Sequence, residues 1–166
     1  MIERLISGGQ TGADQAGLAV AKCLGIPTGG YAPKGWLTEA GPCPDLGASY
    51  GLKEADTAAY PERTERNVLA SNGTVVFGDD RSRGSMLTAR LCGRHGRPCL
   101  MVPLHSDPVE AADKLRAWIA GHRVKTLNVA GNRASQAPGI VAFVTIVLER
   151  ALGTGRVAFS SEAQHE

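Results

Sequence analysis

The sequence predicts an α/β protein with a three-layer, Rossmann-like, doubly wound parallel sheet of about five strands. Short apolar runs bounded by glycine or proline recur at intervals too long for hairpins, and helical patterns lie between them. The 166 residues are 43% hydrophobic and 20% charged, which is typical of one globular domain. We expect residues 1–152 to form a single ligand-binding domain and residues 153–166 to be a flexible tail.

The first strand and helix flank a glycine-rich loop. The run Arg4–Ser7 predicts a strand, and the segment from Asp14 to Cys23 predicts an alanine-rich helix that Gly25 and Pro27 stop. This strand, loop and helix form the first unit of the sheet.

The middle of the chain is less regular. A weak strand is expected over residues 28–32, followed by an irregular stretch over 33–61 whose length is typical of a functional loop. A helix is predicted over 62–70 and a buried strand over 74–77.

The alternation continues to the end of the domain. It predicts helices over residues 85–94, 108–120 and 139–152, and strands over 98–102 and 124–130. The last helix is apolar on nearly all sides between Ile140 and Leu148. This pattern indicates either a homo-oligomer (dimer or tetramer) or a central helix in a monomer.

Composition argues against several classes of partner. A net charge of +2 does not favour nucleic acid or a membrane surface, and the sequence shows neither a signal peptide nor a membrane span, so we expect a cytoplasmic protein. The four cysteines have no C-x-x-C spacing, which predicts reduced thiols and no metal site.

Polar and glycine-rich residues gather in the loops that follow the predicted strands, at the edge where parallel sheets bind ligands. In the first loop, glycines and the start of a helix could bind a phosphate, with Thr11 adding a hydroxyl donor. The alternative is a tight turn with Asp14 at the helix start. The candidate residues of this loop are Gly8, Gly9, Gln10, Thr11, Gly12 and Asp14. They match neither a P-loop nor a dinucleotide fingerprint.

The later loops supply arginines and one aromatic side chain. Arg81, Arg83 and Arg133 could pair with an oxyanion or lie on a solvated surface, and Asp79 and Asp80 are expected to pair with them rather than bind a cation.

Two other segments carry open interpretations. After the second strand come Lys34 and Trp36, whose indole could stack on a flat ring or pack on the core. For Arg63 and Asn67, which share one helical face with Thr64 beside them, a solvated face is expected.

The sequence resembles the molybdenum-cofactor carrier proteins, a Rossmann-like family related to the lysine-decarboxylase-like, or LOG, superfamily. The resemblance covers most of the chain and is carried by the segments 7–14, 33–35, 62–68, 84–88, 127–135 and 138–140. It implies an oligomeric protein that binds molybdenum cofactor, which is a phosphorylated pterin with an oxo-molybdenum centre. Another phosphorylated pterin or a nucleotide is the alternative ligand. The full set of expected binding residues adds Lys34, Trp36, Gly84, Ser85, Thr88, Asn132 and Ser135 to the glycine-loop residues and the three arginines.

One departure from the LOG enzymes argues against catalysis. Those enzymes carry P-G-G-x-G-T-x-x-E, and Thr88 stands where the catalytic glutamate would be. We therefore expect a carrier with no catalytic residues. The alternatives are a nucleotide-processing hydrolase or transferase that uses Asp14 as its acid or base, and a nucleotide sensor.

Overall fold

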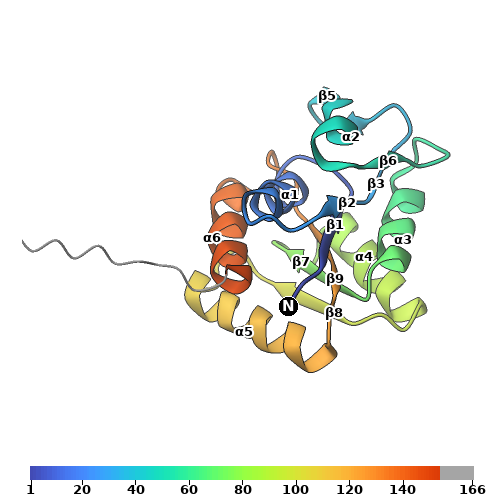
Figure 1. The fold of residues 1–166 in the computed structure, drawn as a ribbon. Coiled ribbons are helices and arrows are strands. Elements are labelled where there is room, and N and C mark those ends of the chain that lie inside the picture. Colours follow the sequence, from blue (N-terminus) through green and yellow to red (C-terminus); the bar gives the residue numbers. More distant parts are fainter. Residues whose placement is uncertain (154–166) are drawn as a thin grey trace, which may run out of the picture.

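The computed structural model describes residues 1–153, which form a three-layer α/β fold around a five-stranded parallel sheet (Figure 1). The strand order is β2-β1-β9-β7-β8. These strands span Thr28–Gly29, Arg4–Ser7, Thr126–Gly131, Gly73–Phe77 and Cys99–Val102, respectively. The fold class predicted from the sequence is confirmed.

Helices cover both faces of the sheet. α1 (Ala13–Cys23), α5 (Pro108–His122) and α6 (Ile140–Leu152) pack together on one face, and α3 (Tyr60–Ala70) and α4 (Arg83–Arg94) pack together on the other (Figure 1). With both faces covered, the central strands must be apolar along their length, and all five residues of β7 are buried. A continuous apolar run in the sequence therefore predicts such a strand.

The expected strand over residues 28–32 is two short strands in different sheets. β2 pairs with β1, whereas β3 (Tyr31–Ala32) pairs with β6 (Lys53–Glu54) in a separate two-stranded sheet. Gly30 lies between them at φ +121°, and a Cβ on it would be 2.2 Å from the Ser7 carbonyl oxygen. The backbone can turn between the two sheets at this point only because the residue is glycine.

The stretch over residues 33–61 is more ordered than the sequence predicts. It contains the antiparallel pair β4 (Leu37–Thr38) and β5 (Gly41–Pro42), then helix α2 (Asp45–Tyr50) and strand β6. Leu46 and Leu52 are buried in the main core, which anchors this excursion to the domain. The expectation of an irregular loop is wrong here, because strands of two residues and a helix of six residues are too short to leave a periodic pattern in the sequence.

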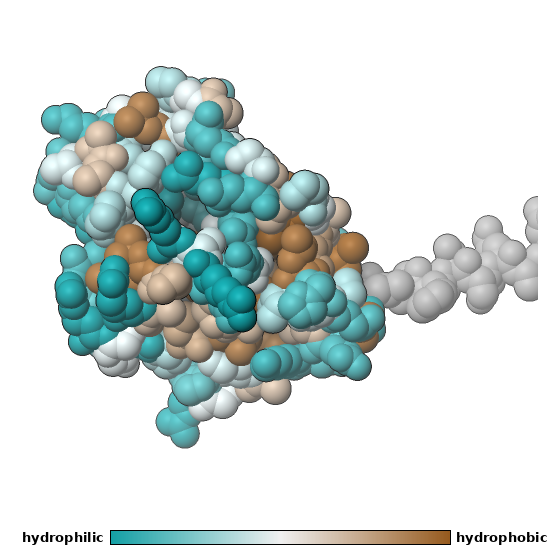
Figure 2. Space-filling model, turned by 180° about the vertical axis from the view of Figure 1, so that it is seen from behind, coloured by the Kyte–Doolittle hydropathy of each residue, from teal (hydrophilic) through white to brown (hydrophobic). Residues whose placement is uncertain are grey.

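The last helix is buried on one side only. Phe143, Val144 and Val147 belong to the core, while Val141 and Ile146 are about half exposed. The surface seen from behind is largely hydrophilic with scattered hydrophobic patches (Figure 2). Assembly into a homo-oligomer stays a prediction.

Two further points concern the helices and the end of the described chain. Within residues 1–153 no helix has the length and apolarity that crossing a membrane would need. Gly153 ends α6, and the rest of the predicted tail, residues 154–166, lies outside the described part of the chain.

Candidate functional site

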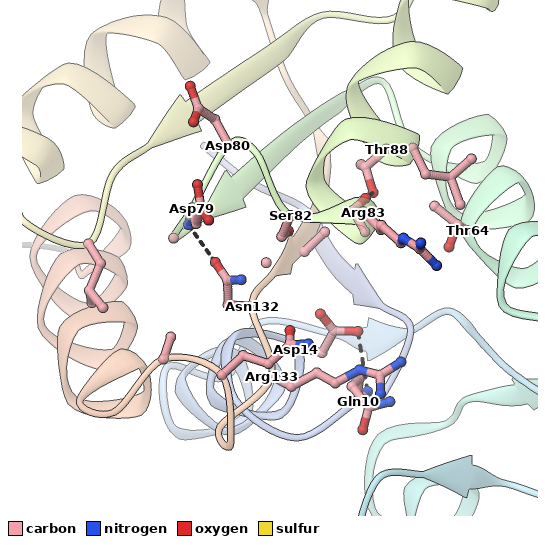
Figure 3. Close-up of a pocket in the computed structure, with 18 of the residues that line it drawn as sticks. Gln10, Asp14, Thr64, Asp79, Asp80, Ser82, Arg83, Thr88, Asn132 and Arg133 are labelled. Atoms are coloured by element: carbon pink, nitrogen blue, oxygen red, sulfur yellow. Dashed lines mark hydrogen bonds between the residues drawn. The ribbon is translucent and has the colours of Figure 1, made fainter.

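A pocket of about 840 Å³ opens at the carboxyl edge of the sheet (Figure 3). Its walls come from the loops after β7, β8 and β9, from the first turns of α4, and from one face of α3. Gln10 and Asp14 close the side next to α1. The volume lies within the range of pockets that hold nucleotides and other small cofactors.

The N-terminus of α4 faces this pocket. Ser82 caps the helix by accepting a hydrogen bond from the Ser85 amide at 3.2 Å, and the two hydroxyls lie 2.9 Å apart. The amides of Arg83 and Gly84 lie in the first turn, where the helix offers them no carbonyl partner. A Cβ on Gly84 would meet no atom within 4 Å, so the backbone here is open to a ligand. The arrangement favours an anion.

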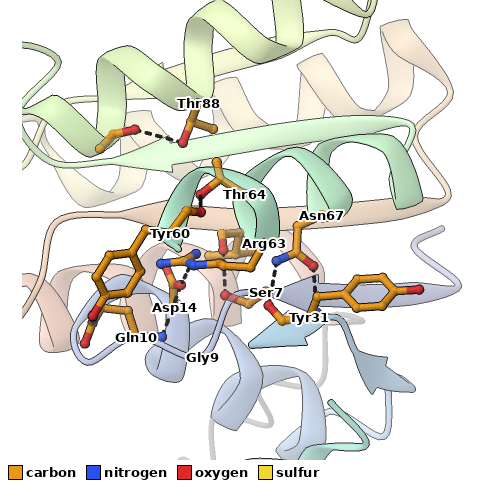
Figure 4. Close-up of polar contacts among 12 residues, drawn as sticks. Ser7, Gly9, Gln10, Asp14, Tyr31, Tyr60, Arg63, Thr64, Asn67 and Thr88 are labelled. Atoms are coloured by element: carbon orange, nitrogen blue, oxygen red, sulfur yellow. Dashed lines mark hydrogen bonds and ion pairs between the residues drawn. The ribbon is translucent and has the colours of Figure 1, made fainter. Parts of the chain in front are cut away.

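The opposite side of the pocket holds a buried ion pair. Nη1 of Arg63 lies 3.4 Å from Oδ2 of Asp14, whose carboxylate also accepts a 3.2 Å hydrogen bond from the Gln10 amide (Figure 4). Burial raises the pKa of Asp14, while the charge of Arg63 and the hydrogen bonds pull it down. Nε of Arg63 is buried and has no hydrogen-bond partner in the described structure.

The expectation of a solvated face on α3 is wrong for Arg63, Thr64 and Asn67. Arg63 makes the pair with Asp14, and Thr64 and Asn67 are buried. The Asn67 side chain accepts from the Tyr31 amide at 2.9 Å and donates to its carbonyl at 3.0 Å, which fixes β3 against the helix (Figure 4). Sequence periodicity could not reveal this, because the partners lie in distant segments.

Tyr60 brings two guanidinium groups together. The Cζ atoms of Arg63 and Arg133 lie 5.5 Å and 5.0 Å from the centre of its ring. Both distances are typical of cation–π contacts. With Arg83, three arginines and one aromatic ring therefore line the same pocket.

The glycine-rich loop packs mainly against the protein itself. A Cβ on Gly8 would lie 1.8 Å from Nη1 of Arg63, and one on Gly12 would lie 2.4 Å from the carbonyl oxygen of Asn132. The Ala13 amide at the start of α1 donates to the same carbonyl at 3.2 Å. These glycines permit close approach to protein atoms.

Glu39 joins this loop to the loop after β9. Its carboxylate accepts hydrogen bonds from the hydroxyls of Thr11 and Ser135 and from the Ser135 amide. The amides of Thr11 and Glu39 both donate to the side-chain carbonyl of Gln10, at 3.0 and 2.9 Å. Thr11 and Ser135 are therefore engaged with Glu39, away from the pocket.

The structure brings seven of the predicted residues into the pocket wall, namely Gln10, Asp14, Arg83, Gly84, Thr88, Asn132 and Arg133. The others lie outside that wall: Gly8, Gly9, Thr11, Gly12, Lys34, Trp36, Arg81, Ser85 and Ser135. Trp36 packs on the core, and a Cβ on Gly47 would be 2.8 Å from its ring. Ser85 is buried beneath its cap and Arg81 is exposed.

The predicted pairing of Asp79 and Asp80 with arginines is also wrong. No ion pair within residues 1–153 involves either aspartate, and Oδ1 of Asp79 accepts from the Arg81 amide at 2.9 Å. The Asp79 amide donates to Asn132, which ties the ends of β7 and β9 together (Figure 3). The described chain also contains no group of three or more potential metal ligands.

Sequence reasoning missed Tyr60, Ser82 and His105 as pocket residues. Ser82 had a readable signal, since it precedes the helix and is a preferred N-cap residue type. Tyr60 and His105 lie in segments whose positions depend on tertiary packing, so no local pattern marks them.

Together, the fold and the pocket define a Rossmann-like α/β protein with a small-molecule pocket at the carboxyl edge of its sheet. Residues 5–152 match the circularly permutated YpsA SLOG family, and the chain belongs to this family.

A solved structure extends the comparison. The chain is 40% identical to a protein of Syntrophus aciditrophicus SB named "Putative molybdenum carrier protein", with a TM-score of 0.85. The match covers 91% of this chain and 95% of the other. Among functionally curated proteins, none matches this sequence. The relationship to molybdenum carrier proteins and to the wider LOG-like superfamily, expected from the sequence motifs, is confirmed.

Proposed function

We propose that this protein binds molybdenum cofactor in the pocket and carries it without chemical change. One observation carries the proposal: the open N-terminus of α4 shares a pocket with Arg63, Arg83 and Arg133. The name of the structural neighbour supports the choice of cargo.

The residues fit the parts of this cargo. The phosphate would lie at the amides of Arg83 and Gly84, where the helix end offers free donors and open space. The arginines would pair with the anionic oxo-metal centre, and Tyr60 would lie beside the pterin in the pocket wall. A phosphorylated pterin or nucleotide would satisfy the same contacts.

Thr88 favours a carrier over an enzyme. It lines the pocket, yet its hydroxyl donates to the Gly84 carbonyl at 2.9 Å, inside its own helix. A hydroxyl in this position cannot replace a carboxylate as a general acid or base at neutral pH.

Arg83 and Arg81 provide a matched test. Arg83 lines the pocket from the start of α4, whereas Arg81, two positions earlier in the preceding loop, is exposed and lies outside the pocket. The wild-type protein mixed with the cofactor should retain molybdenum through gel filtration, measured by elemental analysis. Loss of a charge-assisted hydrogen bond in Arg83→Ala should weaken binding by about tenfold or more, since such bonds contribute about 1.5–3 kcal/mol. Arg81→Ala should bind as wild type.

Two outcomes would overturn the proposal. The first is that no molybdenum elutes with the wild-type protein at micromolar concentration. The second is that both arginine variants weaken binding equally, which would indicate attraction by surface charge alone.

One feature favours a second candidate, a nucleotide-processing enzyme. Asp14 is a buried carboxyl in the pocket with a raised pKa, which is a common property of acid–base residues. A panel of nucleoside monophosphates tests this candidate. Release of free base by the wild type, abolished in Asp14→Asn, would establish it in place of the carrier.

A further inference from the structure

Cys92 and Cys99 lie side by side although they belong to different elements. Cys92 is near the end of α4, and Cys99 is the first residue of β8. The chain folds back between them, and the Arg97 amide donates to the Cys92 carbonyl at 2.9 Å. Cys99 packs against the small buried cluster formed by Val68, Leu91 and Cys92.

Thr74 on β7 lies in the same part of the sheet. It is the register partner of Cys99 in the β7–β8 pair, and it is also one of the groups that lower the pKa of Cys92. Cys99 has the largest effect on that pKa, which agrees with the packing of Cys99 against the cluster that contains Cys92.

The two thiols differ in acidity. Hydrogen bonds from Cys99 and then Thr74 lower the pKa of Cys92 to about 7, against the opposing effect of burial. The same bond from the other side, together with burial, raises the pKa of Cys99. A thiolate beside a protonated thiol is the arrangement from which disulfides form.

We propose that Cys92 and Cys99 are a redox-active dithiol that a hydroperoxide converts to an intramolecular disulfide. Cys23, which is exposed, and Cys43, which is half-buried, belong to other parts of the fold and take no part. The proposal does not rest on the proposed cofactor binding.

The chemistry balances with the hydroperoxide as the only added reactant. The ionised sulfur of the pair attacks the O–O bond, becomes a sulfenic acid and releases an alcohol, or water when the oxidant is hydrogen peroxide. The neighbouring thiol then attacks the sulfenic sulfur, the S–S bond forms, and a water leaves. The two thiols lose two electrons and two protons in total, and the peroxide is reduced.

The pair lies next to the ligand pocket. Leu87 packs against the cluster that contains Cys92, and it also lines the pocket. Cys99 is the partly exposed member and Cys92 is fully buried, so a small oxidant has to pass Cys99 to reach the ionised sulfur of Cys92. The modification site is therefore one side chain behind the pocket wall.

Peptide mass spectrometry tests the proposal on the full chain with Cys23→Ser and Cys43→Ser, which leaves only the two cysteines in question. The folded protein is treated with hydrogen peroxide, denatured, alkylated and digested with trypsin. Cleavage after Arg94 separates the cysteines, so a disulfide joins two peptides. We expect this linked pair, the loss of both alkylation sites, and full reversal by dithiothreitol.

Single variants provide the control. Cys99→Ser keeps Cys92 without its partner thiol, so the peroxide reaction should stop at a sulfenic acid on Cys92. Cys92→Ala is a second variant if the first does not fold. Two results would overturn the proposal. One is that both cysteines of the folded parent stay fully alkylatable after the peroxide treatment. The other is that the only disulfides found join two protein molecules.

Discussion

Gly12 lies so close to the loop after β9 that no side chain fits there. A Cβ on this residue would be 2.4 Å from the Asn132 carbonyl oxygen and 2.7 Å from the Ala134 amide nitrogen. Its backbone angles, φ 84° and ψ −125°, are also outside the regions open to other residues. We predict that Gly12→Ala lowers the free energy of unfolding substantially.

The expected loss can be worked out from these two effects. A strained backbone conformation costs about 1–3 kcal/mol. Forcing a methyl group against neighbouring backbone costs about 1–3 kcal/mol more, because carbonyl and amide atoms cannot rotate away as a side chain can. The sum is about 4 kcal/mol, a large part of the ~5–15 kcal/mol that stabilises a typical domain.

Gly25 is the matched control. It also has a positive φ, 71°, but a Cβ there would meet nothing within 4 Å. Gly25→Ala should therefore cost only about 1 kcal/mol. Urea unfolding followed by circular dichroism gives both values if the slopes agree. If Gly12→Ala costs no more than Gly25→Ala, the glycine loop is not the packed junction described above.

Two further predictions concern the two sides of the pocket. Gly84→Ala should leave thermal stability unchanged or raise it, since alanine favours a helix by up to about 1 kcal/mol relative to glycine. Its methyl group should weaken cofactor binding, measured by equilibrium dialysis. Unchanged affinity would contradict a phosphate at α4. Arg63→Met should lower the free energy of unfolding by about 3 kcal/mol, because it leaves the buried Asp14 unpaired. Because the folded-state pKa of Asp14 is raised above its ordinary 3.8, its contribution to stability is complete below that value and is lost as the pH rises through the folded-state pKa. Arg63→Met should raise the pKa of Asp14 further and extend the loss of stability to higher pH. Asp14→Asn should remove this dependence of stability on pH. Unfolding measured from about pH 4 to about pH 8 compares the three proteins, and identical pH profiles would refute the assignment.

Local patterns predicted the central sheet because its strands have a simple environment. The residues of β7 are all buried between two helical layers, and a continuous apolar run is enough to mark such a strand. The excursion after β2 has no comparable signal. Its position depends on Gly30 turning the backbone beside Ser7 and on Leu46 reaching the core, and both contacts join segments that are distant in sequence.

The candidate site was predictable only in part, for a similar reason. The rule that ligands bind at the carboxyl edge predicts that Arg83, Asn132 and Arg133 lie together, and the structure places all three in one pocket wall. Arg63 was missed because its partner, Asp14, is 49 positions away and the helical pattern around it resembles a solvated face. A glycine in the sequence shows that a Cβ is absent, but it does not show whether a ligand or the protein occupies the space.

The same distinction decides which helix N-terminus should receive the anion. At α1, the Ala13 amide already donates to Asn132, and the buried carboxyl of Asp14 would repel a phosphate wherever it is ionised. At α4, the amides of Arg83 and Gly84 face open space, and no acidic residue lies in the first turn. A phosphate at α1 would have to displace protein contacts and approach a like charge, whereas a phosphate at α4 would add hydrogen bonds that are otherwise made only to water. The phosphate end of the proposed ligand therefore belongs at the loop after β7, although the loop after β1 carries the more conspicuous motif.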